Sequence, residues 1–297
     1  MPIPTRDPIV TIPVSTPIDS QDRVDHDALS RNVERWLKTP AAGFCVGTAT
    51  GEEWFLSEDE KLEIARTVKG GLDEKRFLMG GIDCPGVTET LRKAEAFAAA
   101  GAEMLRVRIP RYREIVVDYF DQVLPRSPLP VMVMHQSNPE RFGSVGEPAA
   151  SAEIIGEIVN RDNVFGYTTD HDVRFEANVR QHVAKDKRFW ICNGSLILHG
   201  TLIGCNGTTT AFANVWPAAL YEMLEMGMSG RHDEARPLQE KVQRIDAVML
   251  SCGPWGVKAA MNLVGYEGTK PRAPMREPPK ETIAALEQEL RNAELIS

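Results

Sequence analysis

The chain has 297 residues, of which 42% are hydrophobic and 26% are charged, and its formal net charge is −8. This composition is typical of a folded globular protein with enough apolar residues for a large core. A net negative charge works against nonspecific attraction to nucleic-acid phosphates and to anionic lipid. We therefore expect neither a nucleic-acid partner nor a membrane partner.

The beginning of the chain, MPIPTRDPIV, lacks the basic and then apolar layout of a signal peptide. No apolar run approaches the roughly 20 residues that are needed to span a bilayer. The five cysteines form no CxxC pair, and their odd number leaves at least one thiol free. We expect a cytoplasmic protein without structural disulfides.

Short apolar runs alternate with longer amphipathic stretches along the chain, which is typical of β-then-α units around a parallel sheet. Some of these runs are rich in Val, Ile, Phe and Thr, and each predicts a strand. The predicted strands cover residues 9–16, 43–48, 76–83, 104–110, 130–136, 163–170, 188–195 and 206–212.

Helical patterns with one apolar face follow the first three strands, at residues 25–38, 57–71 and 88–101. Ser57 and Glu60 form a capping-box pattern at the start of the second helix, and Gly101 is a suitable stop for the third. Only helical pattern follows the last strand. We predict an α/β fold, a (β/α)8 TIM barrel with a C-terminal helical extension. In it, residues 1–217 form the barrel and residues 218–297 complete and extend it within the same structural unit.

Active sites of such barrels lie at the carboxyl ends of the strands. The residues at these positions form a polar ring that contains no lysine, whereas Lys69, Lys185 and Lys187 fall in helical or pre-strand segments. The ring consists of Thr16, Thr48 to Glu52, Asp83, Pro110 to Tyr112, Met134 to Gln136, Thr168 to Asp172, Asn193 to Ser195 and Thr208 to Thr210.

Three segments carry a resemblance that runs nearly end to end, namely GTATGEEWFLS (47–57), GCNGTTTAFANVWP (204–217) and GVKAAMNLVGYEGTKPRAPM (256–275). They are similar to the dihydrodipicolinate synthase / N-acetylneuraminate lyase family of class I aldolases and dehydratases. Thr50, Gly51 and Glu52 match the Gly-Thr-Thr-Gly-Glu loop of that family. The resemblance implies that these three residues shape the substrate-binding loop.

The family's chemistry depends on a lysine at the end of strand six, which attacks the ketone of a 2-oxo acid. In this chain NVFGYT (163–168) places Thr168 in that catalytic slot. A hydroxyl group cannot form an iminium, so we expect no lysine Schiff base. Ordinary aldolase chemistry would remain possible only if strand six were formed by other residues than 163–170.

Other family positions are also altered. The resemblance implies that Tyr112 is the strand-four tyrosine, whereas Met134 replaces the strand-five tyrosine and leaves the adjacent His135 as an acid/base candidate. Arg141 matches the arginine that holds the substrate carboxylate by two parallel hydrogen bonds. Further substrate-binding candidates at the strand ends are Asp170 and Asn193.

Arg106 and Arg108 lie on one face of the predicted fourth strand because side chains alternate with a period of two. On a lumen face they would require acidic partners such as Asp83, Glu52 or Asp170, and would favour an acidic substrate. Alternatively, they are ion-paired within the strand or face outward against the helices.

The loop Thr168 to Asp172 could bind a divalent metal together with His135 and Asp83. Asp-His-Asp in a loop is more often part of a turn or a helix cap. We therefore expect neither a metal nor another cofactor.

The resemblance favours lyase or hydratase chemistry on a small 2-oxo or carboxylic acid, without a lysine Schiff base. The alternative is a non-catalytic barrel that binds a small acidic metabolite or regulates a catalytic relative. The family also implies a homo-oligomer, either a dimer or a tetramer. Turnover of 2-oxo acids or sugar acids would distinguish the enzyme from the binding protein.

Overall fold

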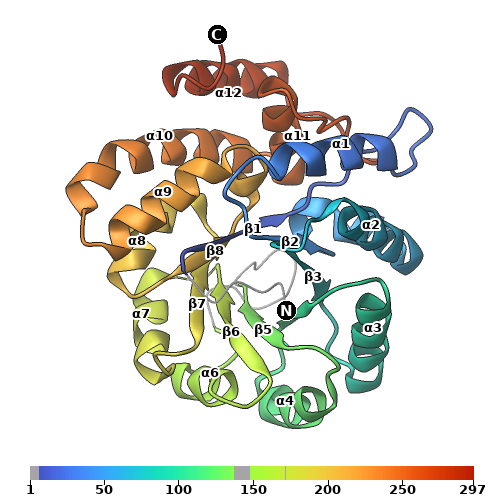
Figure 1. Cartoon of the computed structure of the whole chain (residues 1–297), viewed down its shortest axis with the longest axis vertical. Helices are drawn as coiled ribbons and strands as arrows, with labels where there is room; N and C mark the ends of the chain where they lie inside the picture. Colours follow the sequence, from blue (N-terminus) through green and yellow to red (C-terminus); the bar gives the residue numbers. More distant parts are fainter. Residues whose placement is uncertain (1–6, 137–147, 171) are drawn as a thin grey trace.

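The computed structural model describes residues 7–136, 148–170 and 172–297. Within them, eight parallel strands form a closed barrel in sequence order, with β1 paired to β8 (Figure 1). Each strand lies inside a predicted run, so the predicted TIM barrel is confirmed. The strands are β1 Ile9–Pro13, β2 Gly43–Val46, β3 Phe77–Ile82, β4 Met104–Arg108, β5 Val131–His135, β6 Val164–Thr169, β7 Arg188–Ile191 and β8 Gly207–Thr209.

The α-helices form a ring outside the strands, and α12 lies farthest from them (Figure 1). The capping box at the start of α2 is present, with Ser57 and Glu60 each accepting a hydrogen bond from the other's backbone amide. The helices are α1 His26–Trp36, α2 Glu58–Gly71, α3 Val87–Ala99, α4 Val116–Val123, α6 Ala152–Val159, α7 Val173–His182, α8 Ile197–Leu202, α9 Pro217–Met228, α10 His232–Leu250, α11 Pro254–Leu263 and α12 Lys280–Asn292.

The C-terminal helices continue the packing of the helical ring. Helix α10 packs against α8, α9 and α12, and α11 contacts both α10 and α12. Among the described residues, no helix is long and apolar enough to cross a membrane.

The amino-terminal half of the barrel lumen is filled with apolar side chains. They are fully buried, because alternate side chains of each strand point inward. This cluster consists of Ile9, Cys45, Phe77, Met79, Met104, Met132 and Trp190. The lumen is therefore closed at that end, and any site must open at the carboxyl ends of the strands.

Strand β6 contains an irregularity that decides the direction of its side chains. The pairing of β5 with β6 shifts register next to Val131 and Met132. Phe165 packs against the lumen cluster, whereas Tyr167 lies outside the barrel in the surrounding apolar core. Thr168 therefore points inward, and its hydroxyl lies 3.0 Å from the thiol of Cys192.

Candidate active site

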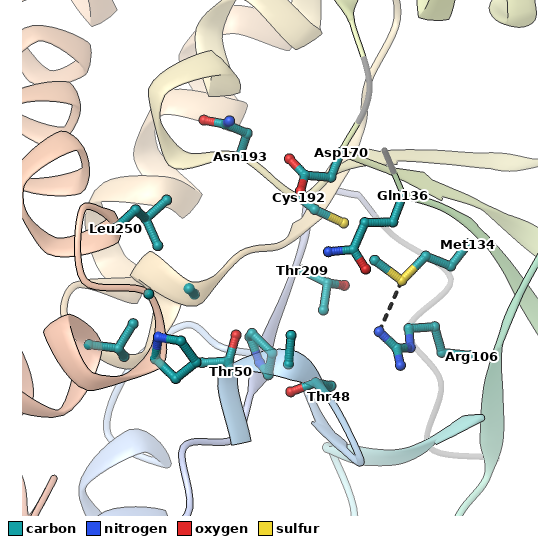
Figure 2. A pocket seen from close by; sticks show the side chains of 16 residues that line it. Thr48, Thr50, Arg106, Met134, Gln136, Asp170, Cys192, Asn193, Thr209 and Leu250 are labelled. Carbon is teal, nitrogen blue, oxygen red and sulfur yellow. Dashed lines mark hydrogen bonds between the residues drawn. The ribbon is translucent and has the colours of Figure 1, made fainter. Parts of the chain in front are cut away.

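A cavity of about 240 Å³ opens at the carboxyl ends of the strands (Figure 2). Three of the expected substrate-binding residues, Thr50, Asp170 and Asn193, line it. The described residues that line the cavity are Pro13, Thr48, Ala49, Thr50, Arg106, Met134, Gln136, Asp170, Cys192, Asn193, Thr209, Ala211, Leu250, Gly253, Pro254 and Val257. Lysine is not among these residues.

Arg106 brings a positive charge to the cavity wall from the middle of β4. Its side chain is only 3% exposed, and its guanidinium donates to the Gly47 carbonyl oxygen at 3.0 Å and to the Met134 sulfur at 2.9 Å. The Nε atom has no hydrogen-bond partner among the described residues. Since a thioether is a weak acceptor, the guanidinium is incompletely satisfied.

Gly81 on β3 makes room for this arginine. A Cβ atom at Gly81 would lie 2.8 Å from Arg106 Nη2 and 2.1 Å from the carbonyl oxygen of Gly47. Any larger residue would therefore displace either the guanidinium or the backbone after β2. The glycine lets the β2 and β3 backbones approach closely enough for Gly47 to accept the Arg106 hydrogen bond.

Arg106 and Arg108 share one face of β4, as the period of two predicts, and that face is the lumen, since the intervening Val107 lies in the outer core. Arg108 pairs with Asp83, one of its predicted acidic partners, at 2.5 Å, and with Glu53 at 3.6 Å. Glu53 also lies 3.9 Å from Arg106. Burial raises the pKa of Glu53, while the two arginines act in the opposite direction. Glu53 was not among the predicted site residues, because no local sequence pattern distinguishes it from Glu52.

Polar atoms without partners gather around the cavity. Gln136 Oε1 and Thr209 Oγ1 are buried and accept no hydrogen bond from a described residue. Unpaired buried polar atoms cost free energy, so such groups are normally completed by water or a ligand. Burial raises the pKa of the Cys192 thiol to about 12, so it is neutral at physiological pH. The cavity thus offers a cation, amides, hydroxyls and the Asp170 carboxylate to a small polar ligand.

Asn193 is held in place by a short chain of hydrogen bonds after β7. Its Oδ1 accepts from the Ser195 amide at 2.9 Å, and that amide and the Ser195 hydroxyl both donate to Asp246 Oδ2 at 3.0 Å. Asp246 belongs to α10 and is 1% exposed. Burial raises its pKa to about 6. Helix α10 therefore supports this part of the cavity rim.

The expected catalytic role of His135 does not agree with its position. Strand alternation turns Met134 and Gln136 toward the lumen and His135 outward, so it does not line the cavity. Its Nε2 accepts from the Ala149 amide at 3.2 Å, which leaves Nδ1 as the donor to Glu176 Oε1 at 3.4 Å. The same Glu176 oxygen accepts hydrogen bonds from Tyr167 and Thr169. His135 is part of a buried network between the strands and α7.

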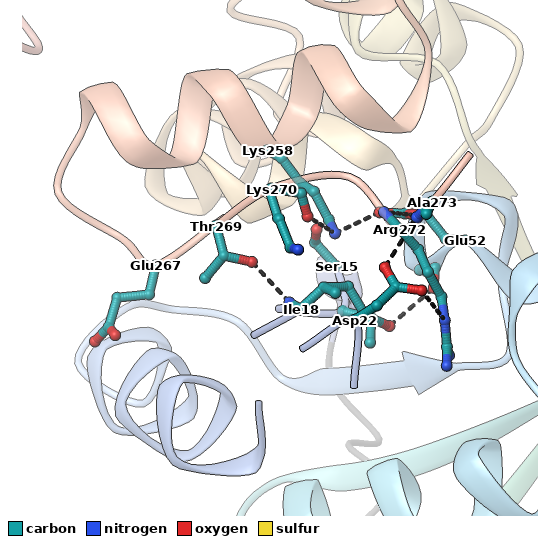
Figure 3. A network of polar contacts seen from close by, with 12 residues as sticks. Ser15, Ile18, Asp22, Glu52, Lys258, Glu267, Thr269, Lys270, Arg272 and Ala273 are labelled. Carbon is teal, nitrogen blue, oxygen red and sulfur yellow. Dashed lines mark hydrogen bonds and ion pairs between the residues drawn. The ribbon is translucent and has the colours of Figure 1, made fainter. Parts of the chain in front are cut away.

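Glu52, which the family resemblance assigns to the substrate-binding loop, does not itself line the cavity. Glu52 is 1% exposed and pairs with Lys258 Nζ at 2.5 Å, and it accepts a hydrogen bond from the Arg272 amide at 2.9 Å (Figure 3). Lys258 in turn donates to the Lys270 carbonyl oxygen at 2.8 Å. Burial lowers the pKa of Lys258, and the Glu52 carboxylate acts in the opposite direction. This pair joins the loop after β2 to α11 and the segment that follows it.

The remaining predicted residues that the structure describes do not line the cavity. Gly51 is buried in the 3₁₀ turn Ala49–Gly51, where its carbonyl oxygen accepts from the Thr16 hydroxyl at 2.8 Å. Thr168 is buried beneath the cavity with its hydroxyl at Cys192. Tyr112 is 61% exposed. Arg141 lies outside the described residues.

The sequence pattern allows a metal site formed by the loop after β6 together with His135 and Asp83. Within residues 7–136, 148–170 and 172–297, no group of three or more His, Cys, Asp or Glu side chains is arranged to hold a metal ion. His171, the histidine of that loop, lies outside the described residues.

A closed eight-stranded barrel with a small polar cavity at the carboxyl ends of its strands is the architecture of TIM-barrel enzymes. The model of the dihydrodipicolinate synthetase family matches residues 8–293. The chain belongs to this family, as the resemblance of its sequence motifs implied.

Curated relatives cover nearly the whole chain. A 4-hydroxy-tetrahydrodipicolinate synthase from Archaeoglobus fulgidus is 26% identical over 290 residues, which are 95% of this chain and 96% of that protein. An uncharacterised DapA-like lyase from Halobacterium salinarum is 27% identical over 296 residues, which are 97% of this chain and 94% of the relative. A probable mitochondrial 4-hydroxy-2-oxoglutarate aldolase from Emericella nidulans is 26% identical over 295 residues, 95% and 93% of the two chains. The family is thus one of lyases with differing substrates.

Solved structures share the fold. A monomeric dihydrodipicolinate synthase variant superposes with a TM-score of 0.89 at 21% identity, covering 100% of this chain and 99% of that one. A prophage protein of the same family from E. coli K12, solved in complex with pyruvate, has a TM-score of 0.85 at 19% identity and covers 97% and 98% of the two chains.

Proposed function

We propose that this protein is a lyase or hydratase of the dihydrodipicolinate synthetase family that acts on a small 2-oxo or carboxylic acid without a lysine Schiff base. One observation carries the proposal: the inward position at the end of β6 holds Thr168, and none of the described residues that line the cavity is a lysine. Lys258 lies next to the cavity-lining Val257, but its amine is engaged by Glu52.

The size and chemistry of the cavity support a small acidic substrate. A volume of about 240 Å³ lies below the range of roughly 300–1,000 Å³ that is typical of sites for drug-sized ligands. Thr48, Thr50, Gln136 and Asn193 can orient a polar molecule, and Asp170 is the ionisable carboxylate of the wall. Asp170 is therefore the general-base candidate of the proposed enzyme.

Borohydride reduction in the presence of pyruvate tests the absence of a Schiff base. We expect intact-protein mass spectrometry to show no adduct, because none of the described residues that line the cavity offers a primary amine. A pyruvyl adduct on any lysine would contradict this part of the proposal. A family member that has the lysine is the positive control.

Turnover tests the enzymatic part. We expect cleavage or hydration of a 2-oxo acid or sugar acid in a screen run with and without divalent cations, and loss of that activity in Asp170→Asn. If the protein binds such acids but converts none of them, the alternative of a non-catalytic binding or regulatory barrel is favoured.

We also propose a homo-oligomer, a dimer or a tetramer, located in the cytoplasm. Tyr112 and Trp54 are large aromatic side chains that are 61% and 44% exposed in the single chain. Exposed aromatic residues are common at protein interfaces. Sedimentation velocity would give the mass in solution, and a monomer would contradict this proposal.

A further inference from the structure

We propose that Arg106 is the residue that binds the carboxylate of the ligand, from inside the lumen. The inference deepens the proposed function, since it rests on a small acid as the ligand. It assigns the anion-binding role to the middle of β4 and not to the loop after β5, where the sequence motif had placed it at Arg141.

The guanidinium of Arg106 is incompletely satisfied by hydrogen bonds. An arginine has five N–H donors and no acceptor, and it is strongly favoured where two parallel hydrogen bonds to a carboxylate can form. Arg106 uses one donor on a carbonyl oxygen and one on the Met134 thioether, and its Nε is unpartnered among the described residues. A carboxylate that replaces the sulfur as acceptor would strengthen the interaction, because a thioether is a weak acceptor whereas with a carboxylate both partners are ionised.

The charge of Arg106 is poorly neutralised by the carboxylates around it. A buried charge is expensive unless it has a close counterion. The nearest described carboxylate is that of Glu53, which is 3.9 Å away and is shared with Arg108, while Asp83 is engaged by Arg108 at 2.5 Å. Arg106 is therefore the less neutralised of the two lumen arginines, and it is the one that lines the cavity.

The cavity wall carries further polar groups that a ligand held at Arg106 could meet. Figure 2 shows Arg106 and Asp170 apart from each other, with Met134 and Gln136 between them. Gln136 Oε1 is buried and unpartnered among the described residues, so it can accept from a ligand hydroxyl or a bound water. A small acid held at Arg106 by its carboxylate would direct its remaining atoms toward Gln136 and Asp170. Arg106 thereby sets the class of ligand: a short-chain acid whose carboxylate enters the lumen first.

Calorimetric titration with oxalate and pyruvate tests the assignment without requiring turnover. We expect Arg106→Gln to lose at least about tenfold in affinity for both acids, because an uncharged amide cannot form the charge-assisted pair. Arg106→Lys should recover only part of this loss, since an ammonium lacks the planar fork of the guanidinium. Pyruvamide, the neutral analogue, should bind with an affinity that none of these substitutions changes by more than about twofold.

One control variant carries the opposite expectation. Glu53→Gln removes the competing carboxylate and should leave oxalate affinity unchanged or higher. Because Glu53→Gln keeps the arginine, it tests the proposal even if Arg106→Gln does not fold, and a lower oxalate affinity in Glu53→Gln would overturn it.

The proposal is also overturned if a folded Arg106→Gln, with a cooperative thermal transition like that of the parent, binds both acids within about twofold of the parent. Absence of saturable binding of either acid to the parent protein overturns it as well. Arg106-dependent binding without turnover of any acid would instead contradict the proposed enzymatic function. It would still support Arg106 as the residue that binds the carboxylate. A borohydride adduct with unchanged Arg106 dependence would contradict only the proposed absence of a Schiff base.

Discussion

Arg106 and Lys258 are both almost fully buried beside the cavity, with 3% and 1% of their surfaces exposed, but their surroundings differ. Lys258 has a carboxylate at 2.5 Å and a carbonyl oxygen at 2.8 Å. Arg106 has a thioether, a carbonyl oxygen and a carboxylate 3.9 Å away. A buried cation with matched partners holds the backbone together, whereas one with unsatisfied donors at a cavity is available to a ligand.

The largest effect that would test this comparison is expected at Lys258. Lys258→Met should lower the free energy of unfolding by about 3–5 kcal/mol, because it leaves the buried Glu52 carboxylate without its counterion. Urea denaturation measures the change. The double variant Glu52→Gln, Lys258→Met should recover much of the loss. If the single variant were as stable as the parent, the pair would not be the structural link described here.

His135 provides the corresponding test for the outer network. His135→Ala should cost about 2–3 kcal/mol of stability, since it removes a buried side chain, leaves the Ala149 amide without its acceptor and takes one of three hydrogen-bond donors from Glu176 Oε1. The affinity of the His135→Ala variant for oxalate should equal that of the parent protein, because the His135 side chain does not line the cavity. Oxalate affinity that is lost in a folded His135→Ala variant would return this residue to the site.

Asp246 is a buried carboxylate whose folded-state pKa lies above the ordinary value of 3.8, at about 6. The folded state therefore holds the proton more tightly than the unfolded state, and stability falls as the pH rises from about 4 to about 6. Asp246→Asn should raise the free energy of unfolding at pH 7 by about 1–2 kcal/mol and have little effect near pH 4. Thermal melts across this range give the profile, and a pH-independent difference would contradict the assignment.

The smallest stability effect is expected at the ligand-binding cation. Arg106→Gln should change the free energy of unfolding by about 1 kcal/mol or less, because the loss of its hydrogen bond to Gly47 is offset by removal of a buried charge that has no close counterion. Glu53 remains 3.6 Å from Arg108. The same urea denaturation as for Lys258→Met measures the change. A loss equal to that of Lys258→Met would mean that the two buried cations are both structural.

The sequence determined the architecture because strands, caps and helix faces depend on short-range patterns. All eight strands lie within the predicted runs, and the capping box of Ser57 and Glu60 is present. The period of two also placed Arg106 and Arg108 on one face correctly. Among the candidate site residues, Thr50, Asp170 and Asn193 were predicted at the strand ends and do line the cavity.

Only the tertiary structure decided which of the polar residues meet the cavity. Glu52 and Glu53 are adjacent in the chain, yet a 3₁₀ turn with Glu52 at a positive φ of 61° directs one to Lys258 and the other to the lumen arginines. Alternation along β5 places His135 on the opposite side from Met134 and Gln136, but the local pattern does not define which side faces the lumen. Only the structure shows that His135 points outward. Glu52 accepts from the Arg272 amide 220 residues away, and no local pattern encodes a pairing over such a separation.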